Sequence, residues 1–311
     1  MIGLVTLFGG GGFLGRYVTQ ELLKRGVRVR IAQRVPRDAW FLRTLGGLGQ
    51  TQFVAADITR PDTVARALEG ADAAINLVGI LDGHFDAVHV AGARTVAAAA
   101  TAAGIKALVH VSAIGANPDS PSAYGRSKGE GEAAVREAFA NATIIRPSVI
   151  FGAEDGFVNR FARLAQLPVV PVLRADAKFQ PAHVADVARA IASAALEPGT
   201  HGGKTCELGG PETISMADLN RRIARAIGRE PTFVMVPDAV GAALARLGGW
   251  LPGAPITWDQ WLMLQQDNVV GKGSPGFASF GITPAPLEAI APGWLVQYRP
   301  QGRFSTTGKA A

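Results

Sequence analysis

Residues 5–18 read VTLFGGGGFLGRYV, with four consecutive glycines between an apolar run and a helical pattern. Two phosphate-loop spacings overlap in this stretch. Gly10, Gly12 and Gly15 form G-x-G-x-x-G, whereas Gly9, Gly12 and Gly15 form G-x-x-G-x-x-G. Either spacing lets the backbone turn tightly and bring the first amides of a helix to a phosphate. The residues alone leave the choice between them open.

Strand and helix patterns alternate outward from this loop. Strands are expected at residues 2–8, 27–34, 51–57, 72–80, 106–113 and 142–150, and helices at 13–26, 60–71, 86–104 and 123–139. This alternation predicts an α/β fold with right-handed crossovers and a Rossmann-type, doubly wound parallel sheet. We expect residues 1–150 with 178–210 to form the dinucleotide-binding domain. Residues 151–177 with 211–311 are expected to form a smaller C-terminal lobe.

The net charge of +6 is concentrated beside the glycine loop. Residues 16–43 carry eight basic side chains against two acidic ones, so this window equals the excess of the whole 311-residue chain. A phosphate-rich small ligand accounts for so short a basic window better than a nucleic acid, which needs a wider basic face. We therefore expect a phosphate-bearing ligand and no nucleic-acid partner.

Other features of the composition narrow the class of protein. The single cysteine, Cys206, excludes an internal disulfide framework and a thiolate zinc site, and no histidine spacing indicates another metal. No secretory signal is visible, and no apolar run approaches the roughly 18 to 20 residues that span a bilayer. We therefore expect a cytoplasmic chain that contacts a membrane only peripherally or through partners.

The residues after the second expected strand indicate which dinucleotide is bound. An NAD site of this type usually has an acidic residue about 20 positions after the loop, but residues 22–37 contain none. Arg34 ends the second strand instead, and Arg16 follows Gly15 directly. Arginines suit a 2′-phosphate, so the pattern favours NADPH over NADH. Asp57, at the end of the third strand, is a candidate for the adenine amino group or a simple loop cap.

A second motif lies in VSAIGANPDSPSAYGRSKGEGE (residues 111–132). Tyr124 and Lys128 are four residues apart and therefore share a helix face, and Ser112 ends the preceding strand. In this position the Tyr-x-x-x-Lys pair resembles the short-chain dehydrogenase/reductase superfamily. The resemblance implies that Lys128 holds the nicotinamide ribose and lowers the tyrosine pKa. It also implies that Tyr124 moves the proton and that Ser112 binds a carbonyl.

The same resemblance settles the glycine question in favour of Gly9, Gly12 and Gly15. RPSVIFG (146–152) and PAHVADVA (181–188) are similar to further stretches of the extended and atypical branches of the superfamily. The resemblance implies nucleotide contacts along the chain, at Gly9, Gly12, Phe13, Leu14, Gly15, Arg16, Arg34, Asp57, Val78, Gly79, Ser112, Tyr124, Lys128 and Pro147. His89 stands where extended members often have asparagine, while His84, His110 and His183 are interpreted as packing or hydrogen-bonding residues.

A narrower resemblance covers residues 4 to about 303. GGGGFLGRYV, INLVGIL with FDAVHVAGAR, SAYGRSKGEGE, RPSVIFGAEDGFVNRFA, FQPAHVADVA and ITWDQWLMLQQDNVV are together similar to the NADPH-binding accessory subunits of respiratory complex I. That family implies a structural nucleotide without turnover and contacts with other complex I subunits. It also implies a peripheral location on the cytoplasmic face of the inner membrane. The alternative is a soluble NADPH-dependent reductase, epimerase or dehydratase that uses Tyr124, Lys128 and Ser112 as catalytic residues.

The C-terminal segment offers its own indication. Four of the five tryptophans, Trp250, Trp258, Trp261 and Trp294, fall in the last 62 residues. Trp258, Trp261, Leu262 and Gln265 follow helical spacing, which is typical of a partner interface or of a headgroup-facing surface. A small lobe with tryptophan in its core fits the same composition. We expect residues 237–303 to contain the docking element.

Overall fold

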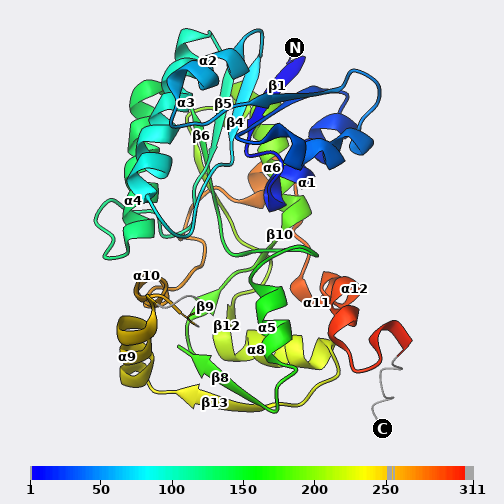
Figure 1. Ribbon diagram of the computed structural model, residues 1–311, viewed down its shortest axis with the longest axis vertical. Helices are drawn as coiled ribbons and strands as arrows, with labels where there is room; N and C mark the ends of the chain where they lie inside the picture. Colours follow the sequence, from blue (N-terminus) through cyan, green and yellow to red (C-terminus); the bar gives the residue numbers. More distant parts are fainter. Residues whose placement is uncertain (1, 251–253, 255, 305–311) are drawn as a thin grey trace. The chain divides into compact units, whose positions relative to one another are not determined.

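The computed structural model describes residues 2–250, 254 and 256–304, which divide into two compact units (Figure 1). The first holds the described residues of Met1–Pro147, Val184–Leu208 and Gly271–Thr283, and the second those of Ser148–His183, Gly209–Val270 and Pro284–Ala311. Four stretches lie in the other unit from the one expected, and two of them, residues 148–150 and 209–210, are short pieces of the second unit. Residues 271–283 belong to the first unit, where Gly271 N–H donates to Glu207 Oε2. Residues 178–183 belong to the second, where they pair with other short strands.

The first unit is built on a seven-stranded sheet in the order β11-β6-β5-β4-β1-β2-β3, with all neighbours parallel. This confirms the expected Rossmann-type fold. The strands are β1 (Leu4–Phe8), β2 (Arg28–Gln33), β3 (Thr51–Ala55), β4 (Ala73–Asn76), β5 (Ala107–Val111), β6 (Thr143–Pro147) and β11 (Thr205–Leu208). The chain leaves β1 toward β2 on one side, and β4 pairs with β1 on the other. The chain therefore turns in opposite directions after β1 and after β4. Folds of this type bind ligands at such a switch point, beside the carboxyl ends of the strands.

Helices cover both faces of this sheet (Figure 1). Helix α1 packs against α6, whereas α3 packs against α2 and α4. The helices of the unit are α1 (Phe13–Lys24), η1 (Pro36–Leu45), α2 (Pro61–Leu68), η2 (Asp86–Gly92), α3 (Ala93–Ala102), α4 (Ala123–Ala138), α6 (Val184–Leu196), α7 (Pro198–His201) and η3 (Phe277–Phe280). Of these, η2 is a π-helix that runs directly into α3.

The second unit contains three two-stranded sheets surrounded by short helices. Its strands are β7 (Ile150–Phe151), β8 (Val169–Leu173), β9 (Lys178–Phe179), β10 (Ala182–His183), β12 (Ile214–Ser215) and β13 (Thr232–Val236). Its helices are α5 (Val158–Leu164), α8 (Met216–Ala226), α9 (Asp238–Gly248), α10 (Trp258–Met263), α11 (Leu287–Ile290), α12 (Pro292–Leu295), η4 (Val296–Tyr298) and η5 (Gly302–Phe304). Ser215 caps α8 by accepting from the Asp218 N–H at 3.1 Å, because a helix start leaves amides without intrahelical partners.

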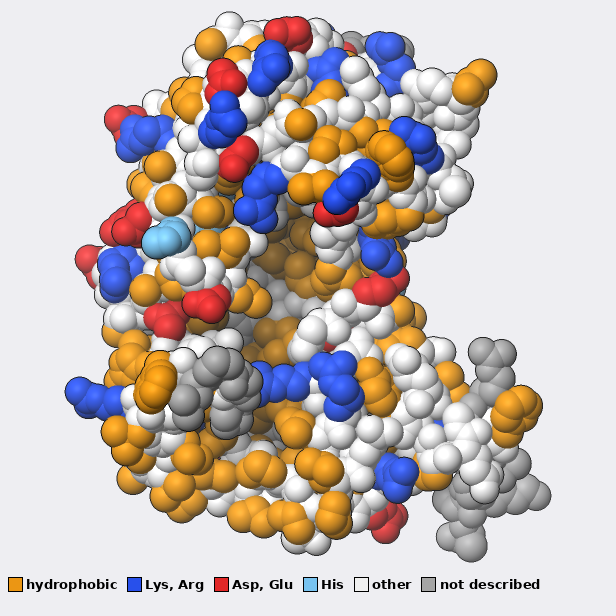
Figure 2. Space-filling view, in the orientation of Figure 1, with side chains coloured by type: hydrophobic (Ala, Val, Ile, Leu, Met, Phe, Trp, Pro, Cys, Tyr) orange, Lys and Arg blue, Asp and Glu red, His pale blue; other side chains and the backbone are white. Residues whose placement is uncertain are grey.

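Apolar side chains gather on the outside of the second unit, over β8, β13 and α9 (Figure 2). We call this surface the β8–β13–α9 face. Its members are at least 43% exposed and comprise Leu167, Val169, Val234, Met235, Val240, Leu244 and Leu247. Helix α9 has only two charged residues; Asp238 pairs with Arg174, and Arg246 lies over the Trp258 ring. A helix that is apolar on nearly every side is normally covered.

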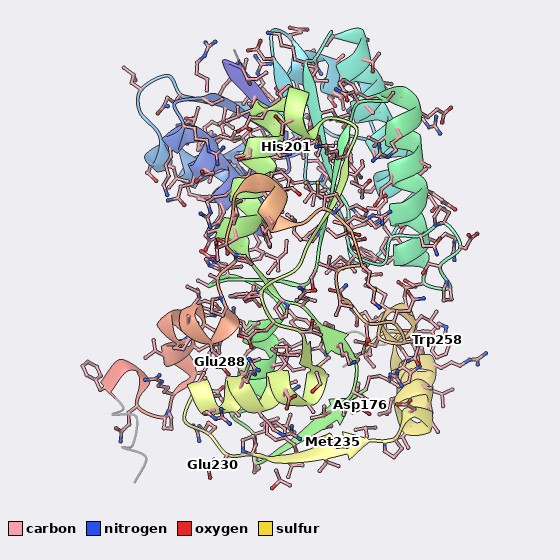
Figure 3. All side chains as sticks on the ribbon, turned by 180° about the vertical axis from the view of Figure 1, so that it is seen from behind. Asp176, His201, Glu230, Met235, Trp258 and Glu288 are labelled. Carbon is pink, nitrogen blue, oxygen red and sulfur yellow. The ribbon has the colours of Figure 1, made fainter. Side chains whose placement is uncertain are left out.

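The two tryptophans of α10 do not share an exposed face. Trp258 is 39% exposed (Figure 3), but Trp261 is 4% exposed and packs with Ala245 and Ile256. A Cβ added at Gly241 of α9 would lie 2.6 Å from the Trp261 ring, so the indole fills space that the glycine leaves open. The expectation that Trp261 belongs to a partner surface is therefore wrong. Its ring belongs to the core of the second unit.

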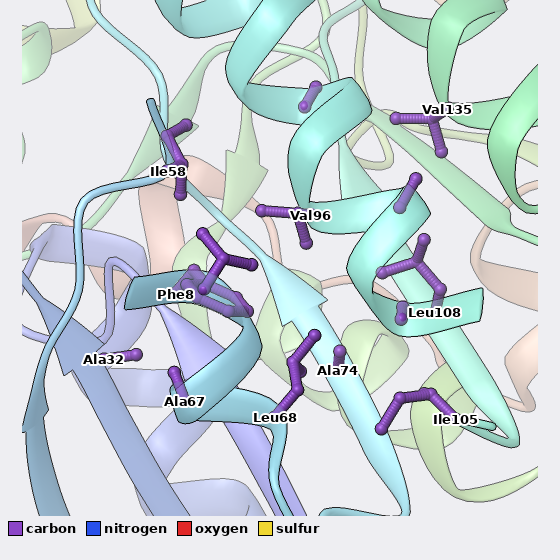
Figure 4. Close-up of a cluster of buried hydrophobic side chains, with 14 of the residues drawn as sticks. Phe8, Ala32, Ile58, Ala67, Leu68, Ala74, Val96, Ile105, Leu108 and Val135 are labelled. Atoms are coloured by element: carbon purple, nitrogen blue, oxygen red, sulfur yellow. The ribbon is translucent and has the colours of Figure 1, made fainter. Parts of the chain in front are cut away.

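Apolar side chains from the sheet and from α2, α3 and α4 form the core on one face of the first unit (Figure 4). Phe8, Leu68, Val96 and Leu108 are each at most 2% exposed. Burying a side chain of this size stabilises a fold by roughly 1.5 to 3 kcal/mol. The alternating strands and helices of the sequence thus find their partners by covering this face of the sheet.

A half-buried ion-pair network joins α4, β6 and β11 in the same unit. Arg146 donates to both Glu132 oxygens, at 2.8 and 2.7 Å, and to Glu207 Oε1 at 3.3 Å. The hydrogen bonds to Glu132 raise the pKa of Arg146 above its ordinary value, against the opposing effect of burial. Glu207 also accepts from the Gly271 N–H. One network therefore connects α4, β6 and β11 with residues 271–283.

Replacing Arg146 by methionine should destabilise the first unit by about 3 to 5 kcal/mol, because the buried Glu132 carboxylate loses its partner. The matched control is Arg94→Met, which breaks the Arg94–Glu137 pair on the exposed surface between α3 and α4 and should cost at most about 1 kcal/mol. Hydrogen exchange of the β6 and β11 amides measures the opening of this unit directly. An equal loss of stability in the two variants would contradict the proposed contribution of the Arg146 network.

Candidate functional site

The glycine loop after β1 places its strictest demands on Gly9 and Gly15. Gly9 has φ +81°, which a residue with a side chain rarely adopts. A Cβ on Gly15 would lie 2.5 Å from the carbonyl oxygens of both Gly9 and Gly10, so α1 sits directly on the loop backbone. Gly12 is the extended N-cap of α1, and its N–H donates to Gly9 O at 3.1 Å. These three glycines therefore shape the turn.

The start of α1 is suited to an anion. Its first turn, which begins at Phe13 and Leu14, contains no acidic side chain, and its N-cap Gly12 has no side chain to cap the amides. A helix start carries partial positive charge and amides without intrahelical partners. A pyrophosphate supplies the oxygen acceptors that these amides need, so the loop fits a dinucleotide.

The end of β2 carries Gln33 and Arg34 in place of an acid. Gln33 Oε1 accepts from the Gly11 N–H at 3.0 Å, and its Nε2 donates to Val35 O at 2.8 Å. This neutral amide holds the glycine loop. Neither sequence motif predicts this role, and the lack of an acid near the end of the second strand is the signal that could have pointed to Gln33. Arg34 is exposed beside it, and the Arg16 guanidinium lies 4.9 Å from the centre of the Phe41 ring.

Asp57 acts locally as a cap of the loop after β3. Its Oδ1 accepts from the N–H and the hydroxyl of Thr59, at 2.9 and 2.7 Å. These bonds lower the Asp57 pKa below its ordinary value, and the positive charges of Arg34 and Arg60 add to the effect. Asp57 is therefore a loop cap, and its contact with the adenine amino group stays a prediction.

The segment after β4 approaches the glycine loop from the side opposite to β2, because β1 lies between β4 and β2 in the sheet. A Cβ on Gly9 would lie 3.3 Å from Val78 Cγ2, so the two loops are in contact there. The Val78 N–H donates to Asn76 Oδ1 at 3.1 Å. A Cβ on Gly79 would lie 3.9 Å from Lys128 Nζ, which places Gly79 beside the lysine of the second motif.

Tyr124 and Lys128 project from the first turns of α4, whose N-cap Ser122 accepts from the Gly125 N–H. Lys128 is buried, and its Nζ donates to Val111 O at 2.9 Å. Burial lowers the Lys128 pKa to about 8, partly opposed by the Glu132 charge, and burial raises the Tyr124 pKa to about 12. The tyrosine is therefore protonated at neutral pH.

Ser112 follows Val111 at the end of β5 and completes the group. Its hydroxyl is buried and has no hydrogen-bond partner within the described part of the chain. A buried hydroxyl without a partner is costly, which indicates a place for a ligand group. Pro147 at the end of β6 is buried nearby in the sheet, where its carbonyl accepts from the Ile114 N–H.

No three His, Cys, Asp or Glu side chains of residues 2–250, 254 and 256–304 are grouped so that they could hold a metal ion. Over the same ranges, every helix is too short or too polar to cross a membrane.

Comparison with known proteins agrees with this geometry. A family model described as NAD(P)H-binding matches residues 9–198. NADH dehydrogenase (ubiquinone) 1 alpha subcomplex subunit 9 of Rattus norvegicus is 35% identical over 293 residues, covering 92% of this chain and 78% of its own. A ceramide reductase of Caulobacter vibrioides is 31% identical over 76% of this chain and 74% of its own.

Solved structures share the fold. The NADPH-dependent quinone oxidoreductase QOR2 of Escherichia coli, in complex with NADPH, superposes with a TM-score of 0.75 at 23% identity over 92% of this chain and 97% of its own. The fold and the glycine loop thus define an NAD(P)-binding Rossmann protein of the short-chain dehydrogenase/reductase type. The chain belongs to the NAD(P)H-binding family and, within it, to the atypical group that contains subunit 9 of the complex I alpha subcomplex.

Gly15→Ala should destabilise the protein by about 1 to 3 kcal/mol, because its methyl group forces α1 away from the Gly9 and Gly10 carbonyls. NADPH binding should weaken as well, since the first amides of α1 move with the helix. Gly199→Ala in α7 is the control: its methyl group meets nothing within 4 Å, so we expect a change below about 0.5 kcal/mol. Urea unfolding and fluorescence titration with NADPH measure both effects. A Gly15→Ala protein of native stability would refute the close-approach argument.

Proposed function

We propose that this protein is an NADPH-binding accessory subunit of respiratory complex I that performs no turnover of its own. The observation that carries the proposal is the extent of the match to the rat complex I subunit, 92% of this chain and therefore residues of both units. A nucleotide in such a subunit stabilises the fold by mass action, because it binds only the folded state. The proposed location is peripheral, on the cytoplasmic face of the inner membrane and in contact with other complex I subunits.

The proposed nucleotide site combines the two motifs of the first unit. The amides that follow Gly9 and Gly12, at Phe13, Leu14 and Gly15, would hold the pyrophosphate. Val78, Gly79 and Pro147 would line the nicotinamide end, with Lys128 and Tyr124 at its ribose and Ser112 beside the ring. When bound, NADPH supplies a hydride donor. The chain's own residues bind and orient it.

Arg34, together with Arg16, is proposed to select the 2′-phosphate of NADPH. Arg34→Gln should reduce the preference for NADPH over NADH by roughly 1.5 to 3 kcal/mol, because a charge-assisted hydrogen bond is lost. Arg37→Gln is the matched control, since Arg37 is also exposed but its Nε lies 3.9 Å from Asp38 Oδ1. Calorimetric titration with each nucleotide measures the preference. Equal affinities of the unmodified protein for NADPH and NADH would refute the proposal.

The electrostatics around Tyr124 support a role without turnover. A tyrosine that transfers a proton near neutral pH needs a lowered pKa, usually from a neighbouring positive charge. Here burial raises the Tyr124 pKa to about 12, while Lys128 donates to the Val111 carbonyl and has its own pKa lowered to about 8. These directions support the proposal that the pair holds a ribose.

The β8–β13–α9 face is the proposed contact with an apolar surface of another complex I subunit. Large apolar side chains stabilise an interface most where a partner removes them fully from water. Val240, Leu244 and Leu247 provide such side chains along one line of α9. This face takes the place of the Trp261 surface that the sequence analysis expected.

The variant Leu244→Glu/Leu247→Glu should dissociate from complex I, because buried glutamates without partners are strongly unfavourable. Loss of even one anchor commonly costs about 2 kcal/mol, or roughly thirtyfold in affinity. Leu48→Glu, at a fully exposed leucine of the first unit, is the matched control and should stay bound. Native electrophoresis of detergent-extracted membranes reports co-migration. Co-migration of the double variant would contradict this docking surface, and absence of the unmodified chain from complex I would contradict the proposed function.

A soluble NADPH-dependent reductase is the second candidate function. The buried, unpartnered Ser112 hydroxyl favours it, because such a group could bind a substrate carbonyl. The 31% identical ceramide reductase also points to this chemistry. A substrate screen decides between the two: NADPH oxidation that disappears in Tyr124→Phe would establish the reductase, and complex I activity that survives Tyr124→Phe would support the accessory subunit.

A further inference from the structure

His89 is buried in the proposed site, outside both the glycine loop and the Tyr-x-x-x-Lys motif. It lies in the π-helix η2 with 2% of its surface exposed. Its ring stacks on Phe85 at 5.4 Å between centroids and meets the edge of Tyr124 at 5.5 Å. A Cβ on Gly79 would lie 3.6 Å from its Nε2. The imidazole therefore touches both the segment after β4 and the tyrosine.

The hydrogen bonds of His89 determine where its proton sits. The Ile80 N–H donates to Nε2 at 3.0 Å, so this nitrogen carries no proton. Nδ1 therefore carries the proton and donates it to Ser127 Oγ at 2.9 Å, and the Ser127 hydroxyl donates to Tyr124 O at 2.9 Å. The series of donors ends at a backbone carbonyl, which cannot pass a proton on. His89 is consequently a poor proton relay and an effective connector.

The close packing of η2 against α4 makes these bonds possible. A Cβ on Gly131 would lie 2.1 Å from His89 O, so only glycine at this position lets the two backbones approach. Ser127 stands four residues before Gly131, one helical turn along the same face of α4. The glycine thus brings the serine hydroxyl within reach of the imidazole.

A second neutral imidazole supports the other end of the same segment. The Val78 N–H donates to Asn76 Oδ1, and the Asn76 side chain lies 3.3 Å from His110 Nδ1. Both histidines have their pKa lowered by burial and then by the Lys128 charge, His89 to about 4 and His110 well below its ordinary value. Residues 77–80, which we call the β4 loop, are therefore held at Ile80 by the His89 ring and at Val78 by the Asn76 amide, which itself contacts His110.

We propose that His89 is a positioning residue: as a neutral imidazole it ties Ile80 of the β4 loop to the first turn of α4 and sets the spacing between Gly79 and the Tyr124–Lys128 pair. The role toward NADPH rests on the proposed nucleotide site, whereas the tie itself is a property of the chain. The charged or titratable groups that face the imidazole are Lys128 and Tyr124 on α4 and His110 on β5.

The direction of the pH effect follows from the bonds. Protonation of Nε2 removes the acceptor for the Ile80 N–H, so the tie is complete above the ordinary histidine pKa near 6.5 and weakens as the pH falls toward 4. An opened β4 loop frees His89 to titrate normally. The opening equilibrium at Ile80 should therefore increase, on the order of tenfold, between pH 7.5 and pH 5.0.

The experiment follows the hydrogen-exchange protection of the Ile80 amide by NMR in the full chain, normalised for the intrinsic exchange rate at each pH. His89→Gln keeps an acceptor and a donor without titrating, so its Ile80 protection should stay constant over this range. His84→Gln, at an exposed histidine nearby in sequence, should retain the native pH response. A pH response that persists in His89→Gln, or that is absent from the unmodified protein, would overturn the proposal.

Titration with NADPH then tests the link to the nucleotide. NADPH should raise Ile80 protection in the unmodified protein, and His89→Leu, which removes both bonds, should bind it at least tenfold more weakly while His89→Gln binds within about threefold of native. If His89→Leu is poorly folded, the pH response and the His89→Gln affinity still decide. NADPH binding that leaves Ile80 unprotected would refute the positioning role alone. Absence of NADPH binding to the unmodified protein would refute the proposed function. The pH response of Ile80 protection would still test the hydrogen bond between His89 and Ile80.

Discussion

The contact between the start of α1 and the backbone of the glycine loop determines the rest of the site. At Gly15 the helix lies so close to the Gly9 and Gly10 carbonyls that a single methyl group has no room. This approach orients the first amides of α1 along the carboxyl edge of the sheet and brings the loop against Val78 of the neighbouring β4 loop. The two halves of the switch point thus meet through backbone atoms, which leaves side chains such as Gln33 to hold the loop from behind.

A comparable arrangement organises the other half of the site. Gly131 lets α4 approach η2, and His89 then connects Ile80 to Ser127 and Tyr124. In both halves a glycine allows two backbone segments to approach closely, and neutral hydrogen-bonding groups lie beside the contact. Such a framework is well suited to hold a nucleotide rigidly, because little rearrangement is needed on binding. Rigid retention fits the structural role that we propose for the nucleotide.

The basic window beside the loop has mixed uses. Arg43 lies over the rings of Trp40 and Phe53, and Arg30 donates to the carbonyls of Ala67 and Glu69. Arg25 pairs with Glu21. These arginines therefore stabilise the first unit itself, and Arg34 is left as an exposed candidate for a phosphate. Part of the basic window thus serves the fold, and contact of the remaining basic residues with a phosphate stays a prediction.

Local patterns were sufficient for much of this protein. Alternating strands and helices predicted the parallel sheet, and the four-residue spacing placed Tyr124 and Lys128 on one helix face, because both depend on residues near in sequence. The positions decided by tertiary structure depend on distant partners. Trp261 became core because Gly241 of another helix left room for it, and residues 271–283 joined the first unit through Glu207. His89 became a connector because Gly131, 42 positions later, admits its backbone. The spacing of residues along the chain predicts none of these contacts, because each joins residues that are distant in sequence and meet only in the folded protein.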